Sequence, residues 1–349
     1  MAPIGVALIG GGIFAKQEHM PAVMKCDSLA LKAIYSRSLK SAKDTAALYS
    51  KSDPAPELYS ADSDKDHDYS ALLRRDGISA VIIALPIVSQ PEFIKAALAA
   101  GKHVLAEKPI AKDVQTAQNL IAYYKDISAT TKATFAVAEN YRFMPSFVYA
   151  AEQARALGPV THFSVRSFSL MRSNTKWYGT DWRRVPEYQG GFLLDGGVHQ
   201  AAATRLLLGS EARAERVMAV TKQVQEHLPP IDTVNAVVET VSGASGTFQL
   251  SCGSTLSAFE WDVGCERGSV KLRGETVTVK PNEGEEVVKE FVRTTGVSEE
   301  VAAWAEGLVN GEPNKLQSVE EALADLEILE KMFSSGEDEG AVKKYELQI

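Results

Sequence analysis

Three side chains in this sequence of 349 residues could move a proton during the oxidation of an alcohol: Lys108, Asp195 and His199. An imidazole titrates near neutral pH, so His199 could accept the proton of a hydroxyl group. The ammonium of Lys108 could stabilise the developing alkoxide, polarise a carbonyl in the reverse direction or relay the proton. Asp195 and His199 are four residues apart, so a helix that begins near Asp195 would place both on one face.

Each of these residues also has a simpler interpretation. Asp195 could be the N-cap of a helix that continues through the glycines after it. His199 could be a partly buried structural histidine. The two could begin a metal site, but no third ligand follows at motif spacing, and we predict no metal. Whether Asp195 binds substrate or only orients His199 stays open at this point.

A glycine-rich turn lies close to the start of the chain. The apolar run 4–9 leads into Gly10-Gly-Gly-Ile-Phe-Ala15, which fits the pattern G-x-G-x-x-G/A. Gly10 would allow the tight turn, and Gly12 would let the backbone approach a pyrophosphate at the N-terminus of the next helix. The alternative is a purely structural turn. Because an alternating series of strands and helices follows, we predict dinucleotide binding by Gly10, Gly12, Ile13 and Phe14.

The end of the second apolar run bears on the choice of dinucleotide. NAD-specific sites usually place an acid there to accept the ribose hydroxyls. This chain has Ser36-Arg37-Ser38, and the nearest acids in sequence stand before the strand or within the next helix. Arg37 can hold a 2′-phosphate by charge and by stacking on adenine. We therefore predict NADP as the cofactor, the alternative being an exposed loop arginine with mixed preference.

The elements that would position these residues alternate over the first 140 residues. Runs typical of buried strands, separated by helical stretches, indicate a parallel sheet covered on both faces, a Rossmann domain over residues 1–140. Ligands of such sheets bind beyond the carboxyl ends of the strands, where Leu85-Pro86 and Glu107-Lys108 stand. The expected strands are 4–9, 29–35, 80–85, 103–106 and 134–138, and the expected helices are 15–25, 40–49, 69–75, 90–100 and 114–127.

The pattern changes after residue 140. Longer alternating segments and the turn Ser-Gly-Ala-Ser-Gly at 242–246 indicate a second, α+β domain over 141–349 with a large, mostly antiparallel sheet. We also expect the last helix to be able to pack back on the first domain. The expected strands are 160–170, 216–223, 233–241, 246–252, 260–264, 269–272, 276–280 and 286–292, and the expected helices are 147–157, 298–309 and 319–332.

Composition excludes several classes of protein. The chain has 37 Lys and Arg against 45 Asp and Glu, a net charge of −8, and this surplus argues against a nucleic-acid partner. The three cysteines form no C-x-x-C pattern, so neither a disulfide framework nor a zinc site is expected. The longest apolar run, 80–88, is too short for a membrane span. We expect a cytoplasmic protein with no membrane partner.

The motifs together resemble the Gfo/Idh/MocA family of oxidoreductases. The resemblance rests on the glycine turn, Ala84-Leu-Pro86, Glu107-Lys-Pro109 and Gly190-Gly-Phe-Leu-Leu-Asp-Gly-Gly-Val-His199, in the same order along the whole chain. The last of these segments and Thr221-Lys-Gln-Val-Gln-Glu226 are similar to a fungal, yeast-type branch of NADP-dependent members. Many members carry a further acid shortly after the histidine, where this chain has Gln200-Ala-Ala-Ala203.

The resemblance implies roles for further residues. It places the catalytic lysine at Lys108 and the Asp and His at Asp195 and His199, with an active site between the domains. It implies that Leu85, Pro86, Glu107, Asn140, Trp182 and Arg183 contact the cofactor. Trp182 could instead fill a domain interface, Arg183 could pair with an acid, and Tyr141 could either donate a hydrogen bond to substrate or belong to the core.

The predicted function is that of an NADP-dependent dehydrogenase or reductase. It would transfer hydride between the nicotinamide and a carbinol or carbonyl of a small, sugar-like polyhydroxy compound. The open face of the second sheet would form a homo-oligomer, a dimer or tetramer. The alternative is a non-catalytic NADP(H) sensor that acts through a protein partner, although such a protein would not need both Lys108 and His199.

Overall fold

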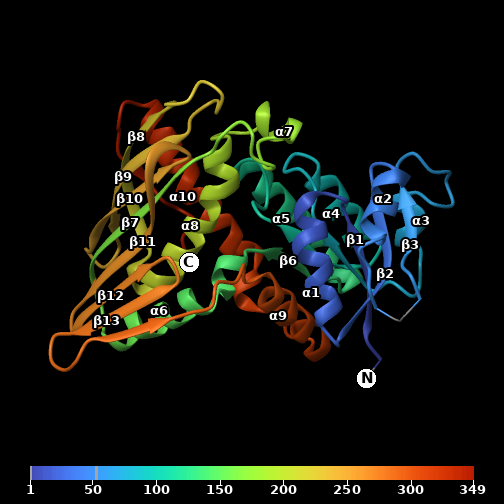
Figure 1. Ribbon diagram of the computed structural model, residues 1–349, viewed down its shortest axis with the longest axis horizontal. Helices are drawn as coiled ribbons and strands as arrows, with labels where there is room; N and C mark the ends of the chain where they lie inside the picture. The colour runs from blue at the N-terminus through green and yellow to red at the C-terminus, as the bar shows by residue number, and fades with distance from the viewer. Residues whose placement is uncertain (1, 52–53) are drawn as a thin grey trace. The chain divides into compact units, whose positions relative to one another are not determined.

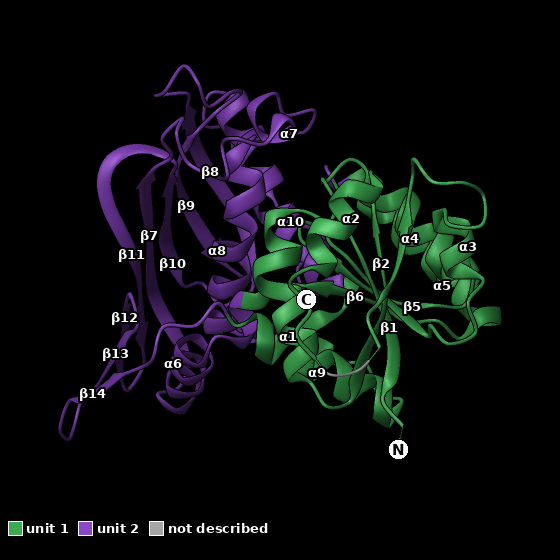
Figure 2. Ribbon diagram, turned by 45° about the vertical axis from the view of Figure 1, so that its right-hand side comes forward, with its two compact units in different colours: residues 1–111, 115–140, 296–319 green, residues 112–114, 141–295, 320–349 purple. Residues whose placement is uncertain are grey.

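The structure is a computed structural model that describes residues 2–51 and 54–349, and the chain divides into two compact units (Figures 1 and 2). Unit 1 comprises residues up to 111, 115–140 and 296–319. Unit 2 comprises 112–114, 141–295 and 320–349. The segment 296–319, which the sequence analysis grouped with the second domain, packs within unit 1. Within the described residues, no helix combines the length and apolar composition needed to cross a membrane.

Unit 1 contains a parallel sheet of six strands in the order β3-β2-β1-β4-β5-β6, which confirms the predicted Rossmann topology. The strands are β1 (Ile4–Ile9), β2 (Leu29–Ser36), β3 (Glu57–Ser60), β4 (Ala80–Ile83), β5 (His103–Glu107) and β6 (Phe135–Ala138). The helices are η1 (Ala15–His19), α1 (Met20–Lys25), α2 (Leu39–Ala46), α3 (Tyr69–Leu73), α4 (Gln90–Ala99), α5 (Val114–Thr131), α9 (Val297–Asn310) and η4 (Lys315–Gln317).

Helix α9 reaches unit 1 through its apolar face. Val297, Val301 and Trp304 are buried in one cluster with Val6 of β1 and Val23 of α1. Burial of large apolar side chains such as these stabilises a domain by about 1.5–3 kcal/mol each. The face of α9 that carries them therefore belongs to the core of the Rossmann unit, although about 160 residues of chain separate it from β6.

Unit 2 contains a sheet of nine strands in the order β14-β13-β12-β11-β7-β10-β9-β8-β15. Among the strand pairs of this sheet that the structure describes, β7 and β10 are parallel and all others are antiparallel. The prediction of a mostly antiparallel sheet is therefore confirmed. The strands are β7 (Val160–Leu170), β8 (Ala214–Lys222), β9 (Thr233–Thr240), β10 (Ser245–Ser251), β11 (Gly253–Cys265), β12 (Gly268–Arg273), β13 (Thr276–Pro281), β14 (Val287–Glu290) and β15 (Lys343–Lys344).

Helices α6, α8 and α10 of unit 2 lie on one side of this sheet (Figures 1 and 2). Every second side chain of β9 is buried, from Val234 to Thr240, as expected when one face of a sheet is covered. The helices are η2 (Asn140–Phe143), α6 (Pro145–Ala156), α7 (Asp181–Arg184), α8 (Phe192–Leu208), η3 (Ser210–Ala212) and α10 (Val319–Glu337).

Candidate functional site

In unit 1, the residues expected to bind the cofactor gather at one edge of the parallel sheet. Gly10 follows β1 and donates its backbone N–H to the carbonyl oxygen of Tyr35 at 2.8 Å. Ser36 ends β2, Leu85 follows β4, and Lys108 follows β5. Because parallel strands all end at the same edge, the fold brings these positions together although they are far apart in sequence.

The geometry of the glycine turn fits a bound pyrophosphate. Gly10 has a φ of +126°, and a Cβ there would lie 2.2 Å from the carbonyl oxygen of Ala84, so the tight turn requires glycine. A Cβ on Gly12 would meet nothing within 4 Å, and Gly12 is exposed. Open space above a backbone that begins a helix is what a phosphate needs to approach the N–H groups.

The end of β2 carries the residues that the sequence analysis assigned to NADP. Ser36 is buried, Arg37 is exposed, and Ser38 caps α2 by accepting a hydrogen bond from the backbone N–H of Ser41 at 3.2 Å. An acid does lie nearby in space: Asp62, just beyond β3, accepts the backbone N–H of Leu39 at 2.7 Å. Asp62 was not considered because it lies 25 residues after Arg37 in the sequence. In the structure its carboxylate already binds the backbone N–H of Leu39 at the start of α2.

Lys108 follows Glu107, and a buried histidine holds that glutamate. His19 Nε2 lies 2.6 Å from Glu107 Oε1, and the His19 side chain is fully buried. No local pattern marks this histidine, because its partner is 88 residues away in the sequence. It lies in η1, a π-helical turn next to the glycine turn.

In unit 2, Asp195 lies in the first turn of α8 and is paired with Arg183. Arg183 Nε donates to Asp195 Oδ2 at 2.7 Å, and the Asp195 residue is only 8% exposed. Gly191, not Asp195, is the N-cap of the helix, with a φ of +53° and the carbonyl oxygen of Pro229 2.3 Å from where a Cβ would stand. The N-cap interpretation of Asp195 is therefore wrong. Arg183 also lies over the ring of Trp182, 4.0 Å from its centroid.

His199 lies one helical turn after Asp195 and stacks on Tyr141. The two rings are 4.5 Å apart and within 13° of parallel, and Phe147 stacks on Tyr141 at 5.5 Å. Stacking in this geometry fixes the plane of the imidazole. Tyr141 is thus both part of an aromatic cluster and in direct contact with the predicted base.

The residue after Tyr141 belongs to a buried ion-pair network. Arg142 donates to Asp325 at 2.7 Å and to Glu321 at 3.2 Å, and Arg205 donates to Asp325 at 2.9 Å. The side chains of Arg142 and Asp325 are 2% and 3% exposed. The network joins α10 to η2, which carries Tyr141, and to α8, which carries His199.

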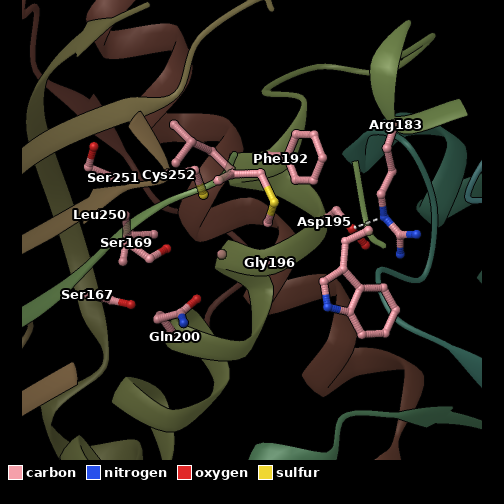
Figure 3. Close-up of a pocket in the computed structure, with 14 residues that line it drawn as sticks. Ser167, Ser169, Arg183, Phe192, Asp195, Gly196, Gln200, Leu250, Ser251 and Cys252 are labelled. Carbon is pink, nitrogen blue, oxygen red and sulfur yellow. Dashed lines mark hydrogen bonds and ion pairs between the residues drawn. The ribbon is translucent and has the colours of Figure 1, made fainter. Parts of the chain in front are cut away.

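A cavity of about 200 Å³ lies in unit 2 between α8 and the sheet, beside the Asp195–Arg183 pair (Figure 3). Hydroxyl and amide groups line it from both sides, from Ser167 and Ser169 of β7 and from Gln200 of α8. The sequence analysis did not assign the two serines, because alternation along a strand does not show which face meets a cavity. The remaining lining residues are Met171, Trp177, Phe192, Leu193, Gly196, Gly197, Leu250, Ser251 and Cys252.

The thiol in this lining is not a nucleophile. Burial, together with the negative charges of Asp232 and Asp195, raises the pKa of Cys252 to about 12. The reactive form of a cysteine is the thiolate. At neutral pH Cys252 is therefore held as the unreactive thiol.

Both parts of the chain match models of one protein family. Residues 4–135 match "Oxidoreductase family, NAD-binding Rossmann fold", and residues 153–343 match "Oxidoreductase family, C-terminal alpha/beta domain", the two Gfo/Idh/MocA models. The match confirms the predicted dinucleotide-binding fold of the first unit.

Individual relatives agree with this assignment. Dehydrogenase FPY6 of Fusarium mangiferae is 38% identical over 97% of this chain and 98% of its own, a fungal relative as predicted. D-xylose 1-dehydrogenase (NADP(+)) 2 of Haloferax volcanii is 28% identical over 79% of this chain and 83% of its own. The crystal structure of an oxidoreductase from Thermotoga maritima superposes with a TM-score of 0.85 at 29% identity, covering 98% of each chain.

Proposed function

The chain belongs to the Gfo/Idh/MocA family of oxidoreductases, and on that premise we propose that it transfers hydride between NADP and a carbinol or carbonyl carbon of a small, sugar-like substrate. The observation that carries the proposal is the cavity beside Asp195, in which hydroxyl, amide and carboxylate groups face one another. Such groups can form hydrogen bonds with the hydroxyls of a polyol. A purely apolar substrate would leave their donors and acceptors without hydrogen bonds.

Charge in the cavity favours an uncharged substrate. Arg183 and Asp195 are the two charged residues that line the cavity, and they are paired with each other. A phosphorylated sugar would need a cation to offset its charge in a partly buried site. We therefore propose a free aldose or polyol, in keeping with the D-xylose named for the archaeal relative.

The cofactor site is proposed from the geometry of unit 1 and, for Trp182 and Arg183 of unit 2, from the resemblance to the family. Gly10, Gly12, Ile13 and Phe14 would hold the pyrophosphate at the start of η1, and the other proposed contacts are Ser36, Arg37, Ser38, Leu85, Pro86, Glu107, Lys108, Asn140, Trp182 and Arg183. Arg37 would hold the 2′-phosphate, which is the reason for proposing NADP. A nicotinamide dinucleotide bound there supplies the hydride acceptor or donor.

The side chains proposed for catalysis manage the proton and the charge. His199, held in plane by Tyr141, hydrogen-bonds the substrate hydroxyl and orients it as the substrate carbon loses hydride. Lys108 stabilises the alkoxide oxygen that forms at the same time and relays its proton. Asp195, fixed by Arg183, lines the cavity and accepts a hydrogen bond from a neighbouring substrate hydroxyl.

A panel of substrates tests the proposal. We expect NADP⁺ to be reduced by at least one member of a set of aldoses, polyols and cyclic alcohols. The variants Lys108→Met and His199→Ala should lose roughly 100-fold or more in kcat while still binding NADPH, because general acid–base catalysis contributes about 10²–10⁴-fold. Tight NADPH binding without turnover of any panel member would support the sensor alternative instead.

The exposed face of the sheet in unit 2 is proposed to pair with a second copy of the chain. Met218 and Val237 are cross-strand neighbours on β8 and β9, both 48% exposed, and Val220 beside them is 66% exposed. Adjacent exposed apolar side chains on one strand pair are typical of an interface. Light scattering should report a dimer or tetramer, and Met218→Glu with Val237→Glu should yield a monomer. A wild-type monomer would contradict this assignment.

A further inference from the structure

Unit 1 contains a group of buried acids that the proposed function does not use. Glu300 of α9 is 1% exposed, and Glu139, directly after β6, is 2% exposed. The two glutamates interact electrostatically, and Glu300 also interacts with Glu107 and Lys108. His19 joins the group through its 2.6 Å contact with Glu107. Glutamates are rarely buried to this degree unless they are paired or protonated.

Among the described residues, three polar atoms of Glu300 and His19 have no hydrogen-bond partner. They are both carboxylate oxygens of Glu300 and Nδ1 of His19, each in a residue at least nine-tenths buried. Buried polar atoms are almost always satisfied by protein or by ordered water. Unpartnered atoms on two neighbouring elements therefore indicate that water and a proton belong among them.

The neighbouring elements supply few charges that could keep Glu300 ionised. The titratable groups that interact with it are Glu107 at the end of β5, Lys108 directly after it, and Glu139 after β6. Helix α1 contributes apolar side chains such as Val23, and Gln317 of η4 donates to the backbone oxygen of Glu300 at 3.1 Å, not to its carboxyl. Burial, and then the charges of Glu107 and Glu139, raise the pKa of Glu300 well above its usual range, while Lys108 opposes the shift.

We propose that Glu300 holds a proton beneath Lys108 and exchanges it with the lysine during the reaction, through water bound among His19, Glu139 and Glu300. Glu300 acts through Lys108 and does not touch substrate. This inference rests on the proposed function, in which Lys108 faces the developing alkoxide.

The proton balance is simple in the direction of carbonyl reduction. As hydride reaches the carbonyl carbon, an N–H bond of Lys108 breaks and an O–H bond forms on the substrate oxygen. The O–H bond of Glu300 then breaks, and its proton restores the ammonium of Lys108. Solvent later returns one proton to the Glu300 carboxylate. Oxidation follows the same steps in reverse, so it requires Glu300 to be ionised before the substrate gives up its proton.

The variant Glu300→Gln tests this role because glutamine has nearly the same shape but cannot carry an exchangeable carboxyl proton. Glu306→Gln is the matched control, since Glu306 is exposed on the same helix. We expect Glu300→Gln to lower kcat at least tenfold and to remove the part of the pH profile in which oxidation rises with pH. NADPH affinity should stay within threefold of wild type, and Glu306→Gln should change neither quantity.

An infrared measurement tests the protonation independently of turnover. The spectrum of wild type minus Glu300→Gln, at neutral pH, should contain the carbonyl stretch of a protonated carboxylic acid. Absence of that band, or a Glu300→Gln enzyme with the kcat and pH profile of wild type, would overturn the proposal. If wild type shows the band but oxidises no substrate of the panel, the proposed function fails and the proton site of Glu300 does not.

Discussion

The ion-pair network around Asp325 predicts an unusually large cost for one substitution. In Asp325→Ala, Arg142 and Arg205 would both lose the buried carboxylate that lies 2.7 and 2.9 Å from their guanidinium nitrogens. Removing one partner of a buried ion pair costs about 3–5 kcal/mol. For a domain of this size, that lowers the unfolding temperature by on the order of 10 °C.

The half-exposed pair between Arg273 and Asp262 provides the matched control. Arg273 Nη2 donates to both carboxylate oxygens of Asp262, at 2.8 and 2.6 Å, so its geometry is at least as good as that of the buried network. The side chains are 40% and 36% exposed, and exposed pairs contribute only about 0–1 kcal/mol. Asp262→Ala should therefore cost at least about 2 kcal/mol less than Asp325→Ala.

Urea unfolding followed by tryptophan fluorescence measures both variants. Trp177, Trp182 and Trp261 lie in unit 2, so the signal reports mainly on the unit that contains both substitutions. Equal losses of unfolding free energy in the two variants would refute the reasoning from burial. A loss in Asp325→Ala of less than about 1 kcal/mol would do the same.

Three further predictions concern the cofactor site and Glu300. Arg37→Ala should weaken NADPH binding by about 10–100-fold, because it removes a charge-assisted hydrogen bond to the 2′-phosphate that contributes about 1.5–3 kcal/mol. NADH binding should not change, and equal losses of affinity for both cofactors in a fluorescence titration would contradict the assignment. Gly12→Val should abolish NADPH binding without unfolding the protein, whereas Gly77→Val, at another glycine with open space around it, should bind normally. Because the pKa of Glu300 is raised, the folded state keeps a proton that the unfolded state loses, and the free energy of unfolding therefore falls as pH rises above about 4.5. The unfolding temperature of Glu300→Gln should therefore rise relative to that of wild type as pH increases. A difference in unfolding temperature that does not change with pH would count against this prediction.

Local patterns in the sequence predicted most elements of the fold. Buried parallel strands appear as continuous apolar runs, and β1, β2, β4 and β6 were all expected close to where they lie. Strand β3 was missed because Glu57–Ser60 is short and half polar, and only its pairing with β2 makes it a strand. The sequence indicated only that a helix could begin near Asp195. Buried residues lie on nearly all sides of α8, so its sequence does not show the alternation of apolar and polar faces that marks an amphipathic helix.

The candidate site was predictable to the extent that motifs carry it. Lys108 was predicted from its position after a strand, Asp195 and His199 from their spacing, and all three from the resemblance to the family. The structure places Asp195 and His199 on successive turns of one helix. The partners that hold them came only from tertiary structure: Tyr141 on His199, and Arg183 on Asp195. Glu300 lies far along the chain from any motif, and sequence alone gives no sign that α9 returns it to the first unit.

Transfer of a labelled hydride tests the central claim most directly. An aldose deuterated at C1 would be incubated with the wild-type protein and NADP⁺, and the reduced cofactor analysed by mass spectrometry and by absorbance. The account predicts NADPH that carries one deuterium and a rate slower than with the unlabelled sugar. Reduced cofactor without deuterium, or none with any aldose or polyol labelled at its oxidisable carbons, would contradict hydride transfer from a sugar-like substrate.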